Sequence, residues 1–225
     1  MQNAQSRPQT TEKAGAEAVR KRARIRFTKE DDLRWISHRD LMRLWERLFR
    51  RAGIALSMTQ GFHPKPRINF PSALAVGIAG VDELLEVDLA EDRSADSLGK
   101  AIASELPEGM AVKAIEMLPA PDRKAQVTFV TFQIAVPPER REKLGQRINW
   151  LLGQATLPIE REGRKNPLDL RLLVAELNLT DGRLCMRLRV DREGSARPRE
   201  VLRALEIEDL EYEGFFLIRT RVEAE

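Results

Sequence analysis

The first hydrophobic pattern in the chain is an alternation, in which Ala23, Ile25 and Phe27 are separated by polar or charged residues. A period of two predicts a β-strand. The period then changes to that of a helix, which Ser37 is placed to cap and which Gly53 can end. The apolar positions of this predicted helix fall on one face: Leu41, Leu44, Trp45, Leu48, Phe49 and Ala52.

The rest of the first half continues with strand and helix patterns. A short strand is expected at Ile54 to Met58, and a longer one at Leu84 to Leu89. A helix that begins at Ser94 or Asp96 and a strand from Met110 to Leu118 complete this part. The resulting order, β-α-β-β-α-β, is that of a ferredoxin-like unit.

The second half repeats this order. Val127 to Val136 predicts a strand, and Pro137-Pro138 opens a helix, because proline is well suited to the first helical turn. Leu157 to Glu162 is expected to be a short edge strand. A last helix, Arg199 to Leu205, leads to a strand from Phe215 to Val222.

Within this half, the clearest local pattern is a hairpin with strands at Leu170 to Leu179 and Leu184 to Val190. Asp181-Gly182 favours a two-residue type I′ turn, which sets the register. On the other face from the leucines, Glu176 is expected opposite Arg187, a pair worth roughly 0.2–1 kcal/mol. The apolar face pairs Leu179 with Leu184, Leu177 with Met186 and Ala175 with Leu188.

These patterns predict an α+β fold made of two tandem ferredoxin-like (β-α-β-β-α-β) domains with antiparallel sheets. We expect the domains at residues 21–118 and 127–225. Residues 119–126 contain two prolines and predict a linker. Residues 1–20 lack hydrophobic periodicity and predict a disordered tail. The repetition rests on the order of the elements alone, since no residue-level repeat accompanies it.

Charge is abundant and unevenly distributed. Charged residues make up 32% of the 225 residues, above the usual share of about a quarter. Residues 1–67 hold 16 Lys and Arg against 7 Asp and Glu, whereas residues 68–118 hold 3 against 10. The basic part can face phosphates, the acidic part of the same domain or another protein.

The same sequence indicates a cytoplasmic protein without a membrane partner. No window approaches 18 consecutive apolar residues, and the N-terminus lacks the apolar core of a secretion signal. Cys185 is the only cysteine and cannot form an internal disulfide.

Four arginines follow one another at steps of four, four and three along the predicted first helix, on the side opposite its leucines: Arg39, Arg43, Arg47 and Arg50. They are either the solvated face of an amphipathic helix or a binding face. The residue type favours binding, because arginine makes planar, bidentate contacts to phosphate and carboxylate.

The segment GFHPKPRINFP, residues 61–71, is a second candidate. Its alternating prolines favour a stiff, extended conformation that would hold Lys65 and Arg67 outward with little further loss of entropy. His63 belongs to the same candidate surface. The alternative is a rigid connection that reverses the chain, in which the imidazole has no role of its own.

Motifs for catalysis, cofactors and metals are not found. His38, His63 and Cys185 do not have metal-ligand spacing, and glycine-rich phosphate loops are absent. His38 is expected to help cap the first helix beside Asp40. Asp169, near Arg171, is more typical of a structural pair than of a functional one. We therefore assign no catalytic residue, metal or cofactor, and the sequence leaves open whether the protein is an enzyme.

Several segments resemble a bacterial radical-SAM-linked family, domain of unknown function 2344. They are ISHRDLMRLWERLFRRAGI, GFHPKPRINFPSALAVGI, ELLEVDL, PLDLR and ARPREVL. In that family the loop often reads Gly-Phe-Asn-Pro-His-Pro, so His63 and Lys65 depart from its pattern. The resemblance implies association with a radical S-adenosylmethionine protein, which would itself perform any radical chemistry, because one cysteine cannot hold an iron–sulfur cluster.

Three functions fit these observations. The first is a non-catalytic accessory module that binds RNA or a ribonucleoprotein through the helix arginines and the loop cations, and presents it to a radical-SAM partner. The second is an adaptor that docks its arginines on an acidic protein surface, for example that of the radical-SAM enzyme. The third is an enzyme that uses His63 with Asp40 or Asp169.

Overall fold

The computed structural model describes residues 21–119, 124–163, 165–191 and 194–225. The expected disordered tail at residues 1–20 lies outside this range, as do residues 120–123 of the expected linker. Ala125, at the end of that linker, is buried, and its N–H donates to Glu86 Oε2 at 3.0 Å. This part of the connection therefore packs against the protein.

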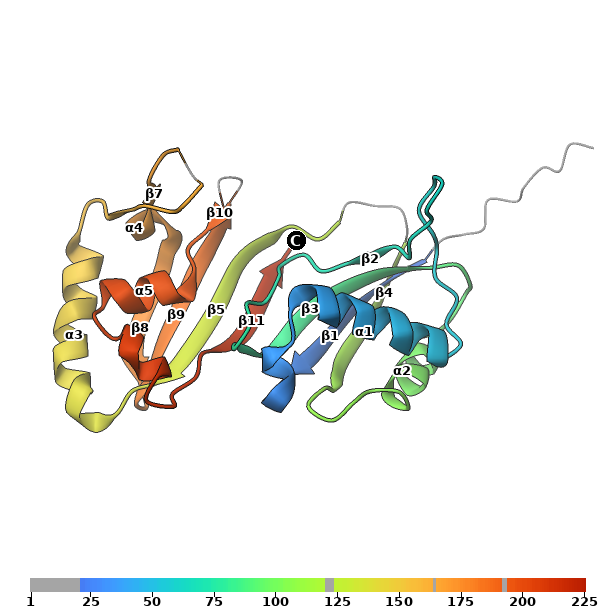
Figure 1. The fold of residues 1–225 in the computed structure, drawn as a ribbon, viewed down its shortest axis with the longest axis horizontal. Coiled ribbons are helices and arrows are strands. Elements are labelled where there is room, and N and C mark those ends of the chain that lie inside the picture. Colours follow the sequence, from blue (N-terminus) through green and yellow to red (C-terminus); the bar gives the residue numbers. More distant parts are fainter. Residues whose placement is uncertain (1–20, 120–123, 164, 192–193) are drawn as a thin grey trace, which may run out of the picture.

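The described residues form a mixed α/β structure around one large, mostly antiparallel sheet (Figure 1). Its main path is β10-β9-β5-β11-β3-β1-β4, with β2 on β3 and β8 on β9. The first half supplies β1 (Lys21–Lys29), β2 (Ile68–Asn69), β3 (Ala79–Leu89) and β4 (Val112–Pro119). Its strand order is β4-β1-β3-β2.

The second half supplies strands in the order β11-β5-β9-β8. They are β5 (Val127–Ala135), β8 (Val174–Thr180), β9 (Arg183–Asp191), β10 (Gly194–Ser195) and β11 (Ile218–Ala224). Two short strands, β6 (Pro158–Ile159) and β7 (Leu168–Asp169), form a separate pair. Among the described strand pairings, only β11 with β3 is parallel, and it joins the two halves through Ile218 opposite Ala79 and Arg219 opposite Gly80.

Helices accompany each half of the sheet (Figure 1). The first half carries α1 (His38–Arg51) and α2 (Ala95–Ala103), preceded by the 3-10 helix η1 (Asp31–Trp35). The second half carries α3 (Pro138–Gly153), the single turn α4 (Leu170–Leu173), α5 (Pro198–Ala204) and the 3-10 helix η2 (Glu208–Glu211). The expected caps are observed, since Ser37 accepts from Asp40 N–H and Ser94 from Ser97 N–H.

Two hydrophobic cores hold these elements together. The core of the first half includes Ile25, Trp45 and Leu85. The core of the second half includes Phe132, but it also takes in Leu74 from the segment before β3. The halves therefore share apolar packing at their junction, in addition to the parallel strand contact.

Three local expectations differ from the structure. Ile54 to Met58 forms no strand, and only the isolated bridges Leu56–Leu89 and Met58–Pro66 are present there. The paired strand of the first half is instead Ile68–Asn69, which bonds to β3. Residues 170–173 form the turn α4 and not the start of a strand, because Asp169 caps it by accepting from Arg171 N–H.

The hairpin is confirmed with one correction. Asp181 and Gly182 both have positive φ, as a type I′ turn requires, and Leu177 lies opposite Met186. The partner of Leu188, however, is Val174 and not Ala175, because the register shifts between Val174 and Glu176. The expected pair between Glu176 and Arg187 forms at 3.1 Å.

Candidate functional site

The arginine face of α1 is exposed to solvent. Arg39, Arg43, Arg47 and Arg50 are all exposed, while Leu41, Trp45, Leu48 and Phe49 on the other side are buried. Arg43 lies 3.7 Å from Asp40, a contact between two exposed side chains. Within the described residues, the other three guanidinium groups have no ion-pair partner. Their positive charge is therefore available to a molecule in solution.

The loop between Met58 and Pro66 is held by its own backbone. Thr59 N–H donates to Lys65 O at 2.8 Å, and Lys65 N–H donates to Thr59 Oγ1 at 3.0 Å. Arg67 folds back and donates from Nε to Met58 O at 3.1 Å, so it is half-buried. The side chains of His63 and Lys65 are exposed. The outward position expected for Arg67 is therefore wrong, because its guanidinium bonds to the loop backbone, whereas Lys65 is exposed as expected.

Phe62, at the tip of this loop, is fully exposed. Phe62 is not among the site residues predicted from the sequence, although an aromatic residue between glycine and histidine in a stiff turn was the available signal. In Figure 1 the chain leaves the C-terminal end of α1 and rises into this loop, which projects beyond the sheet. The loop and the arginine face thus belong to consecutive segments of the chain.

The arginines of β1 differ from those of α1, because each is paired internally. Arg22 lies 2.7 Å from Asp88, Arg24 lies 3.1 Å from Glu86, and Arg26 lies 2.7 Å from Asp82. All three carboxylates are on β3, the neighbouring strand. Part of the basic region in the sequence therefore neutralises the acidic region of the same half.

Asp169 and Asp40, two of the residues considered for catalysis, have local structural contacts. Asp169 caps α4 and accepts from Leu157 N–H at 2.9 Å. Asp40 accepts a hydrogen bond from Ser37 Oγ at the start of α1. Figure 1 places α4 and the loop that carries His63 near opposite ends of the molecule. Asp169 and His63 are therefore not brought together. Arg171 donates to the carbonyls of Leu152 and Val174 and has a structural role.

His38 was expected to help cap α1, but it does not. Its Nδ1 is buried without a hydrogen-bond partner among the described residues, and its ring packs edge-on against Phe70. Burial, together with the nearby charges of Lys29 and Arg219, lowers the pKa of His38. Ser37 alone provides the cap, since its hydroxyl accepts from Asp40 N–H.

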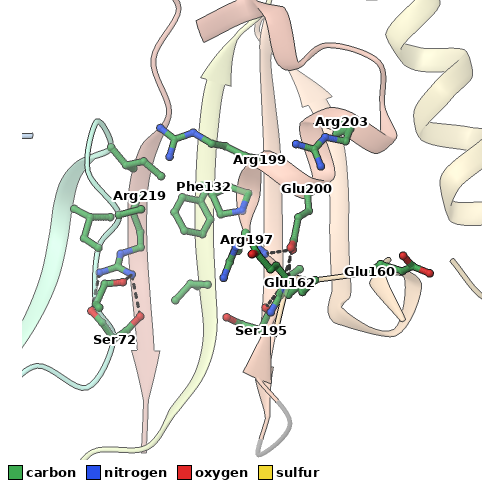
Figure 2. Close-up of a pocket in the computed structure, with 18 residues that line it drawn as sticks. Ser72, Phe132, Glu160, Glu162, Ser195, Arg197, Arg199, Glu200, Arg203 and Arg219 are labelled. Carbon is green, nitrogen blue, oxygen red and sulfur yellow. Dashed lines mark hydrogen bonds and ion pairs between the residues drawn. The ribbon is translucent and has the colours of Figure 1, made fainter. Parts of the chain in front are cut away.

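A cavity of about 710 Å³ lies between the two halves of the molecule (Figure 2). The segment before β3 lines one side, β5 lines the middle, and the segments around β6, β10 and α5 line the other side. Apolar lining residues include Leu74, Ile78, Val130, Phe132 and Pro198. Five arginines also line it: Arg161, Arg197, Arg199, Arg203 and Arg219.

Three of these arginines are fixed by partners. Arg161 forms a bidentate ion pair with Glu200 at 2.6 Å, and Arg199 contacts Glu211 at 2.7 and 2.9 Å. Arg219 pairs with the buried Glu83 and donates to Ser72 Oγ, Ser72 O and Ala73 O. These contacts make a rigid frame around the cavity.

Glu200 is the carboxylate at the centre of this frame. It accepts from Arg161 and from Arg197 N–H, the latter at 2.7 Å. Burial opposes its ionisation, but these hydrogen bonds and the positive charges of Arg161 and Arg197 together outweigh that effect and lower the pKa of Glu200. The carboxylate is therefore held ionised and occupied by protein donors.

Two features were sought in the described residues and not found. These residues contain no group of three or more His, Cys, Asp or Glu side chains placed to hold a metal ion. None of their helices is long and apolar enough to cross a membrane.

Comparison with known proteins identifies the family. The model of a family of uncharacterized proteins conserved in bacteria, domain of unknown function 2344, matches residues 22–200. The chain belongs to this family. Two stretches that carry the family resemblance, residues 61–78 and 196–202, meet at the cavity. They contribute Ser72 to Ala75 and Ile78 from the first stretch, and Ala196 to Glu200 from the second.

For this family member, no match was found among curated proteins. Among solved structures, it is similar to an unknown protein from Galdieria sulphuraria, at 13% sequence identity and a TM-score of 0.28. The alignment covers 92% of this chain and 99% of the other.

Proposed function

We propose that this protein is a non-catalytic accessory module that binds RNA or a ribonucleoprotein. The observation that carries the proposal is the contrast between two sets of arginines. Those of β1 are paired with carboxylates of β3, whereas Arg39, Arg47 and Arg50 on α1 are exposed and have no ion-pair partner among the described residues. Guanidinium groups presented in this way suit the phosphates of a nucleic acid backbone.

The projecting loop favours RNA over an acidic protein surface as the partner. Its tip exposes Phe62 completely, next to His63 and near Lys65. Unpaired RNA bases stack on exposed aromatic rings while cations contact the backbone. An acidic protein surface would use the cations, but it would also have to provide an apolar pocket for this ring.

We further propose that the module works with a radical-SAM protein and that each half of the chain is a ferredoxin-like unit. The radical-SAM partner rests on the sequence resemblance alone. The ferredoxin-like assignment is supported by the matching strand orders, β4-β1-β3-β2 and β11-β5-β9-β8. Two such units would share the sheet through the parallel contact of β11 with β3.

Binding of a labelled single-stranded RNA, followed by fluorescence anisotropy, tests the RNA proposal. The variant Arg43→Gln/Arg47→Gln removes two charges from the exposed face of α1, and it should weaken binding about tenfold or more at low salt. The matched control is Lys100→Gln/Lys143→Gln. It removes two exposed charges from α2 and α3, where each lysine pairs with a carboxylate.

The control should bind as the wild type does. Equal weakening in both variants would mean that only net charge matters and would reject a binding face on α1. The adaptor function would be supported instead if the purified protein bound no RNA but formed a nuclease-resistant complex with a radical-SAM protein that the α1 variant disrupted.

A further inference from the structure

We propose that the cavity between the two halves binds a small organic acid, with an apolar or aromatic body and a single negative charge. This site is distinct from the arginine face of α1, because its lining comes from the segment before β3, from β5 and from the region around α5 (Figure 2). The proposal does not depend on RNA binding.

The size and apolar lining of the cavity define the body of the ligand. A volume of about 710 Å³ lies within the roughly 300–1,000 Å³ of small-molecule sites. Phe132 lies in the middle of the close-up, between the Arg219 side and the α5 side (Figure 2). Leu74 and Ile78 extend the apolar lining on one side and Pro198 on the other. These side chains would contact the apolar body of the ligand.

Arg197 and Arg203 supply the charge that would recognise the acid. Neither guanidinium has a hydrogen-bond or ion-pair partner among the described residues, and both side chains are exposed. The other three arginines of the lining are already bound to Glu200, Glu211 and Glu83. Arg197 and Arg203 therefore form no ion pair among the described residues, although the charge of Arg197 also acts on Glu200. They are the lining arginines that can turn to an anion.

The ligand's charge is limited by two further side chains. Glu160 and Glu162 also line the cavity, and no partner is found for either within the described residues. In Figure 2 the carboxylate of Glu160 points away from Phe132. The negative charges of these two glutamates would repel a polyphosphate. Together with the two arginines, they favour a ligand with a single negative charge, such as a carboxylate or a phosphodiester.

Ion pairs and hydrogen bonds of the protein itself hold both sides of the cavity in place, which lowers the cost of binding. Arg219 contacts both Glu83 of β3 and the backbone of Ser72 and Ala73, so it fixes one side. Arg161 fixes the other side by bonding to Glu200 and to Ser195 O at 2.6 Å. Side chains that are held in place before binding lose little entropy when the ligand arrives.

Fluorescence of 8-anilinonaphthalene-1-sulfonate, an aromatic monoanion, is a suitable probe with the full chain. We expect saturable binding at one site. The variant Arg197→Gln/Arg203→Gln should weaken it about tenfold or more, because charge-assisted hydrogen bonds are lost. Ala75→Trp, at an exposed alanine of the lining, should abolish it by filling the cavity.

Displacement of the probe by other compounds then indicates the chemical class of the acid. Indole-3-acetate and a cyclic nucleotide should displace the probe, and their relative strength distinguishes a carboxylate from a phosphodiester. Uncharged indole and ATP should displace it poorly. Arg43→Gln/Arg47→Gln should bind the probe as the wild type does, which separates this site from the RNA face. Absence of saturable binding to the wild type, or unchanged binding in both cavity variants, would overturn the proposal.

Discussion

His38 shows how one buried side chain couples this fold to pH. Its imidazole packs against Phe70 and faces the positive charges of Lys29 and Arg219. Lys29 is itself buried, with its ammonium directed at the carbonyls of Arg34 and Ile36, and burial lowers its pKa. The folded protein therefore resists protonation of His38, whereas the unfolded chain does not.

The pKa of His38 is lowered on folding. As the pH falls through about 6.5, the unfolded state therefore binds more protons than the folded state does, and the free energy of unfolding decreases. We expect the wild type to lose more stability between pH 7.5 and pH 5.5 than His38→Gln does, as measured by urea unfolding. His63→Gln, which removes the exposed imidazole, is the control. If the difference in unfolding free energy between wild type and His38→Gln did not change with pH, protonation of His38 would not be the cause of the loss.

At the scale of elements, α1 and the hairpin follow from local sequence, whereas β2 does not. Ser37 and the apolar spacing define α1, and Asp181-Gly182 defines the turn between β8 and β9. Ile68–Asn69 is a strand only because it bonds to Val87 and Glu86 of β3. Pairing of this kind depends on residues distant in the chain, which local periodicity cannot indicate.

The hairpin turn offers a test at this scale. Gly182→Ala should destabilise the protein by about 1–2 kcal/mol, because φ is +71° and a β-carbon there is unfavourable. The added carbon would also meet the guanidinium of Arg141. Gly145→Ala, inside α3, should instead stabilise the protein by about 1 kcal/mol, because alanine has a higher helix propensity than glycine. The added carbon meets no atom within 4 Å. Equal effects on the urea midpoint would show that the backbone argument is wrong.

At the scale of the whole molecule, Arg219 ties the two halves together. It lies on β11, is 2% exposed, and pairs with Glu83 of β3, which is 3% exposed. The cavity depends on the same contact, since Ser72 and Ala73 accept from Arg219 on one side of it. Sequence reasoning could not find this site, because its residues come from segments more than 100 positions apart and only the folded sheet brings them together.

Breaking this buried pair should be costly. Arg219→Met leaves the carboxylate of Glu83 buried without its partner and should destabilise the protein by about 3–5 kcal/mol in urea unfolding. Glu83→Leu/Arg219→Met removes both charges and should recover part of that loss. A double variant that is no more stable than Arg219→Met would mean that the loss comes from packing or from the Ser72 and Ala73 contacts.

The salt dependence of RNA affinity shows whether the arginines of α1 contact phosphates. If α1 contacts phosphates, the logarithm of the affinity falls linearly with that of the salt concentration, at roughly 0.7 per contact for a single strand. Arg43→Gln/Arg47→Gln should make that slope shallower by about 1.4, while Lys100→Gln/Lys143→Gln leaves it unchanged. Affinity that does not respond to salt, or an identical slope in wild type and the α1 variant, would contradict binding through this face.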